Sequence, residues 1–211
     1  METIDIYTRV ATIIHLLGVI LGVGTATITD ILFFKFIRDK HISSREAKLM
    51  DELSKIIWVA LIILIVSGVA LYVPNMERLD QSGKFLTKLI GILVLVLNGL
   101  MLSYIIRPKL TKIDFSNNHM SRFGLSHIVN RRMRIWATIC GAVSISSWYY
   151  IFVLGALRGI TFPLQTGIFI YGIILIIAII GSLIFENGAY QKLQHRIHEG
   201  HYKEFKPNHY R

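Results

Sequence analysis

Cysteine is almost missing from this chain: Cys140 is the only one among 211 residues. An intrachain disulfide, a thiolate cluster and a paired-cysteine redox motif are therefore excluded. Cys140 itself is expected to pack as a small apolar residue inside a helix. The sequence also has no phosphate-binding glycine loop, no H-E-x-x-H motif and no serine-nucleophile elbow. The enzyme classes that use these motifs therefore have no support in the sequence.

Charged residues are also few, at 17% of the chain, whereas a soluble domain usually has about 25%. They lie between long apolar runs, and a helix of about 20 apolar residues spans the hydrocarbon core of a bilayer. Because open strands cannot cross lipid, we expect the runs to be helices in one bundle. The start of the chain is acidic, unlike a signal peptide, so the first run is expected to be retained. Five segments qualify: 7–34, 56–74, 86–106, 135–157 and 164–186.

The predicted fold is all-α, a polytopic membrane bundle with five transmembrane helices. Residues 1–190 are expected to form the transmembrane domain, and residues 191–211 a polar, histidine-rich cytoplasmic tail. The first helix could run unbroken from Ile6 to about Arg38, roughly 50 Å at 1.5 Å per residue. It would then be longer than the bilayer is thick, so that its cytoplasmic end projects into water or the helix tilts.

The net charge of +10 is explained more simply by orientation in a membrane than by nucleic-acid binding. Lysine and arginine gather in 35–55, in 107–134 and in the C-terminal tail. Because basic loops remain in the cytoplasm, the N-terminus is predicted outside and the C-terminus inside, in a bacterial-type inner (plasma) membrane. The bilayer is thus the predicted partner. Assembly into a homo-oligomer or into a larger membrane complex is left as an open alternative.

His15 is the one histidine deep inside an apolar run, and an ionisable group at membrane depth indicates a functional site. Helical spacing puts it on one face with Gly18, Gly22, Thr25 and Thr29. The two glycines form a small-x-x-x-small pattern, which lets another helix or a flat ligand approach closely. Three roles for His15 stay open: a packing residue hydrogen-bonded to another helix, a haem or metal ligand, or a proton relay.

A second ligand would have to lie at the outer level of His15. His119, His127 and His195 belong to the cytoplasmic side, roughly 20 Å away along a straight helix. Lys88 in the third run has the most suitable depth. The alternative for Lys88 is that its ammonium extends to the outer interface while its stem remains in lipid.

Other polar residues in the apolar runs are expected to have structural roles. Asp30 should pair with a basic residue such as Lys55 or Arg134, because a lone carboxylate there is unfavourable. Asn98 should hydrogen-bond to a neighbouring helix.

The first and second runs resemble a family of bacterial membrane proteins, the copper-resistance D-like group. The resemblance is carried by His15-Leu16-Leu17-Gly18-Val19-Ile20-Leu21-Gly22-Val23-Gly24, Asp30-Ile31-Leu32-Phe33-Phe34 and the run from Leu53 to Leu71. The HemJ-type protoporphyrinogen oxidases have a related layout and are thought to bind haem through a histidine of the first helix. The resemblance covers the first half of the chain and carries over His15 alone.

The leading hypothesis is a small membrane protein that binds haem b and transfers electrons. His15 would be its axial ligand, and Gly18, Gly22 and Lys88 would be further cofactor-binding residues. The alternatives are a protein that handles copper or another metal through His15, and a non-enzymatic scaffold or complex subunit in which His15 only packs.

Overall fold

The structure of this chain is a computed structural model, and it describes residues 2–39, 44–106, 126–157 and 159–204. Within these ranges the chain is helical, without strands. The long helices are α1 (Glu2–Asp39), α2 (Ser44–Tyr72), α4 (Gly83–Leu100), α6 (Ser126–Ala156) and α7 (Leu164–Glu204). The short elements are η1 (Val73–Asn75), α3 (Met76–Asp80) and the π-helical turn η2 (Met101–Ile106), which continues α4.

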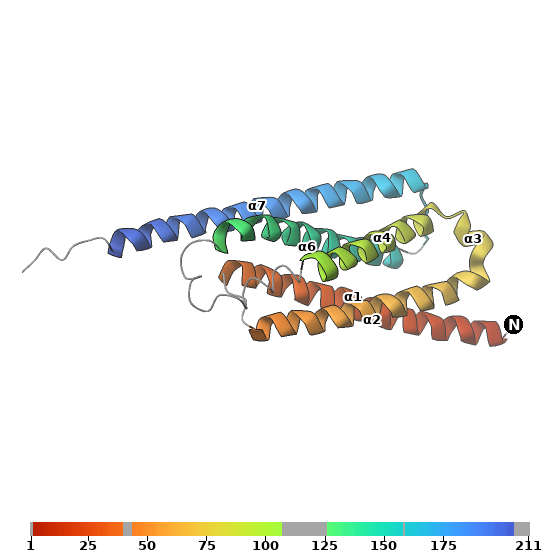
Figure 1. The fold of residues 1–211 in the computed structure, drawn as a ribbon. Coiled ribbons are helices and arrows are strands. Elements are labelled where there is room, and N and C mark those ends of the chain that lie inside the picture. The colour runs from red at the N-terminus through yellow and green to blue at the C-terminus, as the bar shows by residue number, and fades with distance from the viewer. Residues whose placement is uncertain (1, 40–43, 107–125, 158, 205–211) are drawn as a thin grey trace, which may run out of the picture.

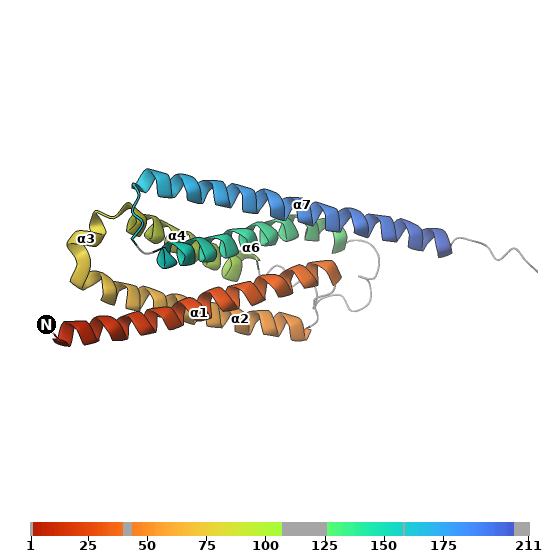
Figure 2. The same ribbon diagram turned by 180° about the vertical axis from the view of Figure 1, so that it is seen from behind.

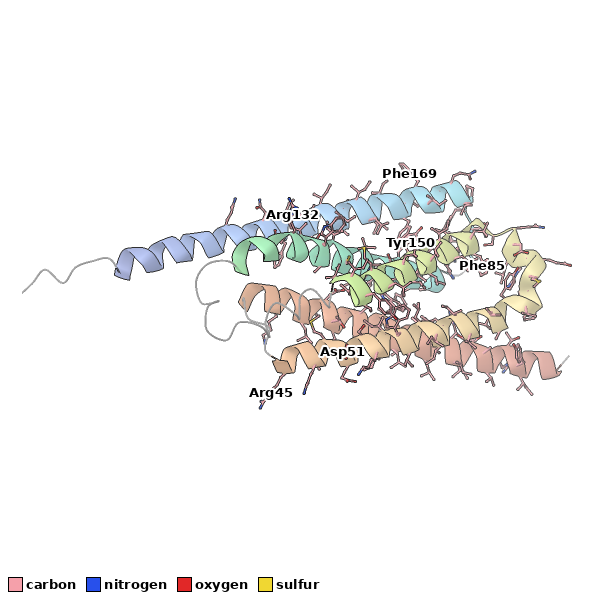
Figure 3. All side chains as sticks on the ribbon, viewed as in Figure 1. Arg45, Asp51, Phe85, Arg132, Tyr150 and Phe169 are labelled. Carbon is pink, nitrogen blue, oxygen red and sulfur yellow. The ribbon has the colours of Figure 1, made fainter. Side chains whose placement is uncertain are left out.

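Five helical stretches are long and apolar enough to cross a membrane, as the sequence predicted: Ile6–Leu32, Lys48–Asp80, Gly83–Ile106, Ile135–Ala156 and Leu164–Gly188. The outward faces carry large apolar side chains, with Ile184 68% exposed and Phe169 69% exposed on α7. Figure 3 shows Phe169 on the side of α7 that faces away from the other helices. A surface of this kind is consistent with contact to lipid.

The helices form an elongated bundle (Figures 1 and 2). α1 is unbroken, as predicted, and packs along α2 as an antiparallel hairpin, while α6 contacts α1, α4 and α7. The start of α1 lies at the same end of the bundle as α3, and we call this end the α3 end. The basic start of α2 lies at the opposite end, where Figure 3 labels Arg45.

A short turn orders the α3 end. Pro74 stands in η1 and ends α2, and the Ser82 side chain caps α4 by accepting a hydrogen bond from the Phe85 amide at 3.3 Å. Tyr72 stacks on Phe85 with ring centroids 5.5 Å apart, and its hydroxyl donates to Asp80. These contacts hold the end of α2 close to the start of α4.

The centre of the bundle is a small apolar cluster to which four helices each give one residue: Ala26, Leu61, Leu95 and Trp148. Gly22 on α1 is where the Trp148 indole of α6 fits, because a β-carbon at position 22 would overlap the ring. One turn earlier, a β-carbon at Gly18 would lie 3.0 Å from Ile63 and Leu64 of α2. The glycine face of α1 is therefore the surface on which α2 and α6 pack.

We expect Gly22→Ala to destabilise the bundle by about 1–3 kcal/mol, the typical cost of overfilling a close-packed contact. Gly24→Ala is the matched control, since a β-carbon at Gly24 meets nothing within 4 Å. The measurement is thermal unfolding of the purified variants in one detergent. Equal midpoints for the two variants would contradict the packing of α1 on Trp148.

Candidate functional site on helix α1

His15 is half-buried and is held by a residue of α2. Its Nδ1 lies 2.9 Å from Oγ of Ser67, which is 3% exposed. The ring lies beside the α2 backbone, since a β-carbon at Gly68 would make an ordinary contact of 3.8 Å with His15 Cε1. The histidine of the first apolar stretch therefore points into the α1–α2 interface, where Ser67 is its hydrogen-bond partner.

The hydrogen bonds of Ser67 determine which nitrogen of the neutral His15 ring carries the proton. A hydroxyl has one hydrogen, and a carbonyl oxygen can only accept. Ser67 Oγ lies 2.6 Å from the carbonyl oxygen of Ile63, so its hydrogen is donated there. Ser67 must then accept from His15, which places the proton on Nδ1 and leaves the lone pair on Nε2. Nε2 is thus the atom of His15 that can bind a metal or accept a proton.

Lys88 of α4 is half-buried, and its positive charge acts electrostatically on the His15 ring. Its ammonium group forms no hydrogen bond or ion pair with another described residue. The neighbouring Lys84 is engaged elsewhere, since it donates to the Leu157 carbonyl. The α3 half of the bundle thus brings together a ligand-competent imidazole and a cation that has no partner in the described part of the chain.

Gly18 and Gly22 lie on the same face of α1 as His15, but their surroundings differ from those of a cofactor slot. The sequence allowed either a helix or a flat ligand against this face, and the structure places side chains of α2 and α6 there. Their role in binding a cofactor stays a prediction. In the structure, Gly18 and Gly22 allow α1 to pack closely on α2 and α6, and this packing positions His15 against α2.

Asp30 does not pair with Lys55, so the Lys55 part of the prediction is wrong. Lys55 instead lies 2.8 Å from Glu52 and 3.5 Å from Asp51 on its own helix, all three exposed. Pairs three and four residues apart on one helix need no long-range approach, so they form more readily than a contact to another helix. The alternative partner, Arg134, has its side chain outside the described part of the chain.

Asn98 bridges two helices, as predicted: its Nδ2 donates to the Cys140 carbonyl of α6 at 2.9 Å. Cys140 is 1% exposed in an apolar cluster with Ile106 and Ala137, in agreement with its predicted packing role.

Ser67 is the residue that sequence reasoning missed. The signal available was a small hydroxyl residue in a long apolar helix, and such residues often hydrogen-bond across helices. The pattern of α2 alone could not show that His15 is the residue it meets.

No group of three or more histidine, cysteine, aspartate or glutamate side chains that could hold a metal ion is present among the described residues. The side chains of His195, His198 and His201, in the histidine-rich tail, lie outside the described part of the chain.

Comparison with models of known protein families, with curated proteins and with solved structures gives no match. The resemblance to the copper-resistance D-like group therefore stays a prediction. The candidate site at His15 is supported by the geometry of its residues alone.

We expect Ser67→Ala to lower stability by about 1 kcal/mol, because it leaves the His15 N–H buried without an acceptor and removes a contact between helices. Ser146→Ala is the control, since the Ser146 hydroxyl bonds only to the Ala142 and Val143 carbonyls of its own helix. Chemical denaturation in mixed micelles would measure both. A loss for Ser146→Ala as large as that for Ser67→Ala would count against the His15–Ser67 bond.

Proposed function

We propose that this chain is a membrane protein that binds haem b, with His15 Nε2 as an axial ligand. The observation that supports the proposal most strongly is the hydrogen bond between His15 Nδ1 and Ser67, which leaves Nε2 available on an oriented ring. A histidine that binds a metal commonly donates its other ring N–H to a neighbouring acceptor, which fixes the ring and strengthens the ligand. Bound haem would supply one-electron redox chemistry.

The site residues fit this group in part. Haem brings four equatorial nitrogens of its own, so the protein needs to provide only one or two ligands. The helix contacts at Gly18 and Gly22 fill the glycine face itself, so a flat group would have to reach Nε2 from another side of the ring. Lys88 is the second proposed binding group, either as an axial amine or as a cation that pairs with the carboxylates of the porphyrin.

Copper handling through His15 has less support than haem. A copper ion takes several protein ligands, and the described residues offer no group of three or more suitable side chains. The copper alternative therefore has to draw ligands from elsewhere, such as thioethers, partner molecules or the histidines of the tail.

A purely structural role has its own supporting observation. The hydrogen bond to Ser67 satisfies one nitrogen of His15, and the glycine face of α1 is covered by α2 and α6. In this second candidate function the chain is a scaffold or complex subunit, and His15 only joins α1 to α2.

The haem proposal predicts a Soret band that shifts on reduction when the purified protein is reconstituted with haem. His15→Ala should abolish the band or weaken it strongly, because the iron loses its primary ligand. His195→Ala is the matched control and should keep the wild-type spectrum, since position 195 is on the far extension of α7. Lys88→Met should change the spectrum if the amine is axial, and only weaken binding if it pairs with carboxylates.

A folded wild-type protein that takes up no haem would overturn the proposal and leave the structural role. A copper content that depends on His15, without a Soret band, would favour the metal alternative.

We further propose that the α3 end of the bundle faces outside and that the basic end faces the cytoplasm of a bacterial cell, as the distribution of lysine and arginine indicates. In a Cys140→Ala background, a cysteine at the exposed position Gln81 should react with an impermeant thiol reagent added to intact cells. A cysteine at Arg45 should react only after the cells are opened. The reverse pattern would invert the proposed orientation.

A further inference from the structure

A second polar site lies far from His15, at the other end of the predicted span of α1. Asp30 is 7% exposed, and its Oδ2 has no hydrogen-bond partner. Fifteen residues separate it from His15, which is roughly 22 Å along the helix at 1.5 Å per residue. The haem proposal does not involve this carboxyl group.

The opposite wall of this site is helix α6. A β-carbon built at Gly141 would lie 3.1 Å from Asp30 Oδ1, so the glycine lets the carboxyl group lie directly against the α6 backbone. Thr138 precedes Gly141 by one helical turn, on the same side of α6. It is 1% exposed, and its Oγ1 is the other buried side-chain atom without a hydrogen-bond partner among the described residues. Two buried oxygen atoms without partners thus occur on the two helices: Asp30 Oδ2 on α1, whose carboxyl group lies against Gly141, and Thr138 Oγ1 on α6, one helical turn before Gly141.

An ionised carboxylate in apolar surroundings is very unfavourable unless a positive charge or a proton compensates it. Lys55, the basic residue of α2 expected here, is bound to Asp51 and Glu52 instead. Arg134 of α6, whose side chain is outside the described residues, is the protein's own remaining candidate. A proton on Asp30 would neutralise the carboxyl group, but no hydrogen bond joins Asp30 Oδ2 to Thr138 Oγ1.

We propose that Asp30 and Thr138 bind a monovalent metal cation of the sodium type between α1 and α6. Carboxylate and hydroxyl oxygens are hard donors, which suit hard cations. One carboxylate balances one positive charge, whereas a divalent ion would leave a net charge buried in the bundle. Gly141 is part of the site because any side chain at that position would occupy the space beside Oδ1.

The test is thermal unfolding of the purified full-length protein in sodium chloride and in choline chloride at equal ionic strength. The wild-type midpoint should rise with the logarithm of sodium concentration, because an ion that binds only the folded state stabilises it by mass action. Asp30→Asn should remove this rise, and Thr138→Val should shift it to higher sodium concentrations. The control Asp51→Asn, at an exposed carboxylate of α2, should keep the full rise.

Direct binding of radioactive sodium to wild-type protein provides a readout that does not depend on whether the variants fold. Saturable binding that is lost in Asp30→Asn, with circular dichroism unchanged, supports the site. Equal wild-type midpoints in both salts and no sodium binding would overturn it. In that case, an Asp30→Asn variant as stable as wild type would identify a protonated carboxyl group, and equal destabilisation by Asp30→Asn and Arg134→Gln would identify an ion pair.

A Soret band in reconstituted protein is unaffected by these outcomes, so the haem proposal and the sodium proposal can fail separately.

Discussion

The structure depends on one constraint: polar groups on helices with apolar outer faces must find their partners inside the bundle. The tyrosine pair between α6 and α7 shows how this is met. The two rings stack with centroids 4.8 Å apart, Tyr150 donates to the Gly167 carbonyl at 2.8 Å, and the Tyr171 hydroxyl lies 2.7 Å from Ser147. Each of these bonds joins two helices that apolar contacts alone would hold less specifically. Because hydrogen bonds are directional, they fix the rotation of one helix against the next.

His15 obeys the same constraint and differs from the tyrosines in one respect. Each tyrosine hydroxyl of the pair has a partner within the bundle, whereas the partner of His15 engages only one of its two nitrogens. The Ser67 hydroxyl links the His15 ring to the backbone of α2, since its own hydrogen is donated to the Ile63 carbonyl. An oriented imidazole whose lone pair is assigned to Nε2 is more than packing of α1 on α2 requires. This additional binding capacity of the His15 ring is the reason to propose a ligand at His15.

Much of the fold follows from the sequence because the membrane imposes a simple length rule. Runs of apolar residues long enough to span lipid can only be helices, so that the five spans and the unbroken α1 could be predicted. The partners of the glycines and of Asp30 could not, because spacing along one helix says which residues share a face but not which helix covers it. Trp148 fills the space at Gly22, and spacing along α1 could not identify it as the partner of that glycine. Lys55 matched Asp30 in charge, but two acidic residues of its own helix were closer.

His15 and Asp30 lie on one helix near opposite ends of its apolar stretch, each against a different neighbour. Ser67 of α2 is the partner of the first, and the α6 wall at Gly141 borders the second. The positions of both depend on α1 being unbroken and closely packed against its neighbours. A single helix thus carries both candidate sites.

The central claim is that Ser67 holds His15 with its proton on Nδ1 and its lone pair on Nε2. Nitrogen-15 NMR of the purified protein, labelled at histidine and assigned with the His15→Ala variant, tests it without any cofactor. The account predicts a protonated Nδ1 and an unprotonated Nε2 for His15, and loss of this tautomer preference in Ser67→Ala. A proton on Nε2, or a His15 signal that averages over both tautomers in the wild-type protein, would contradict it.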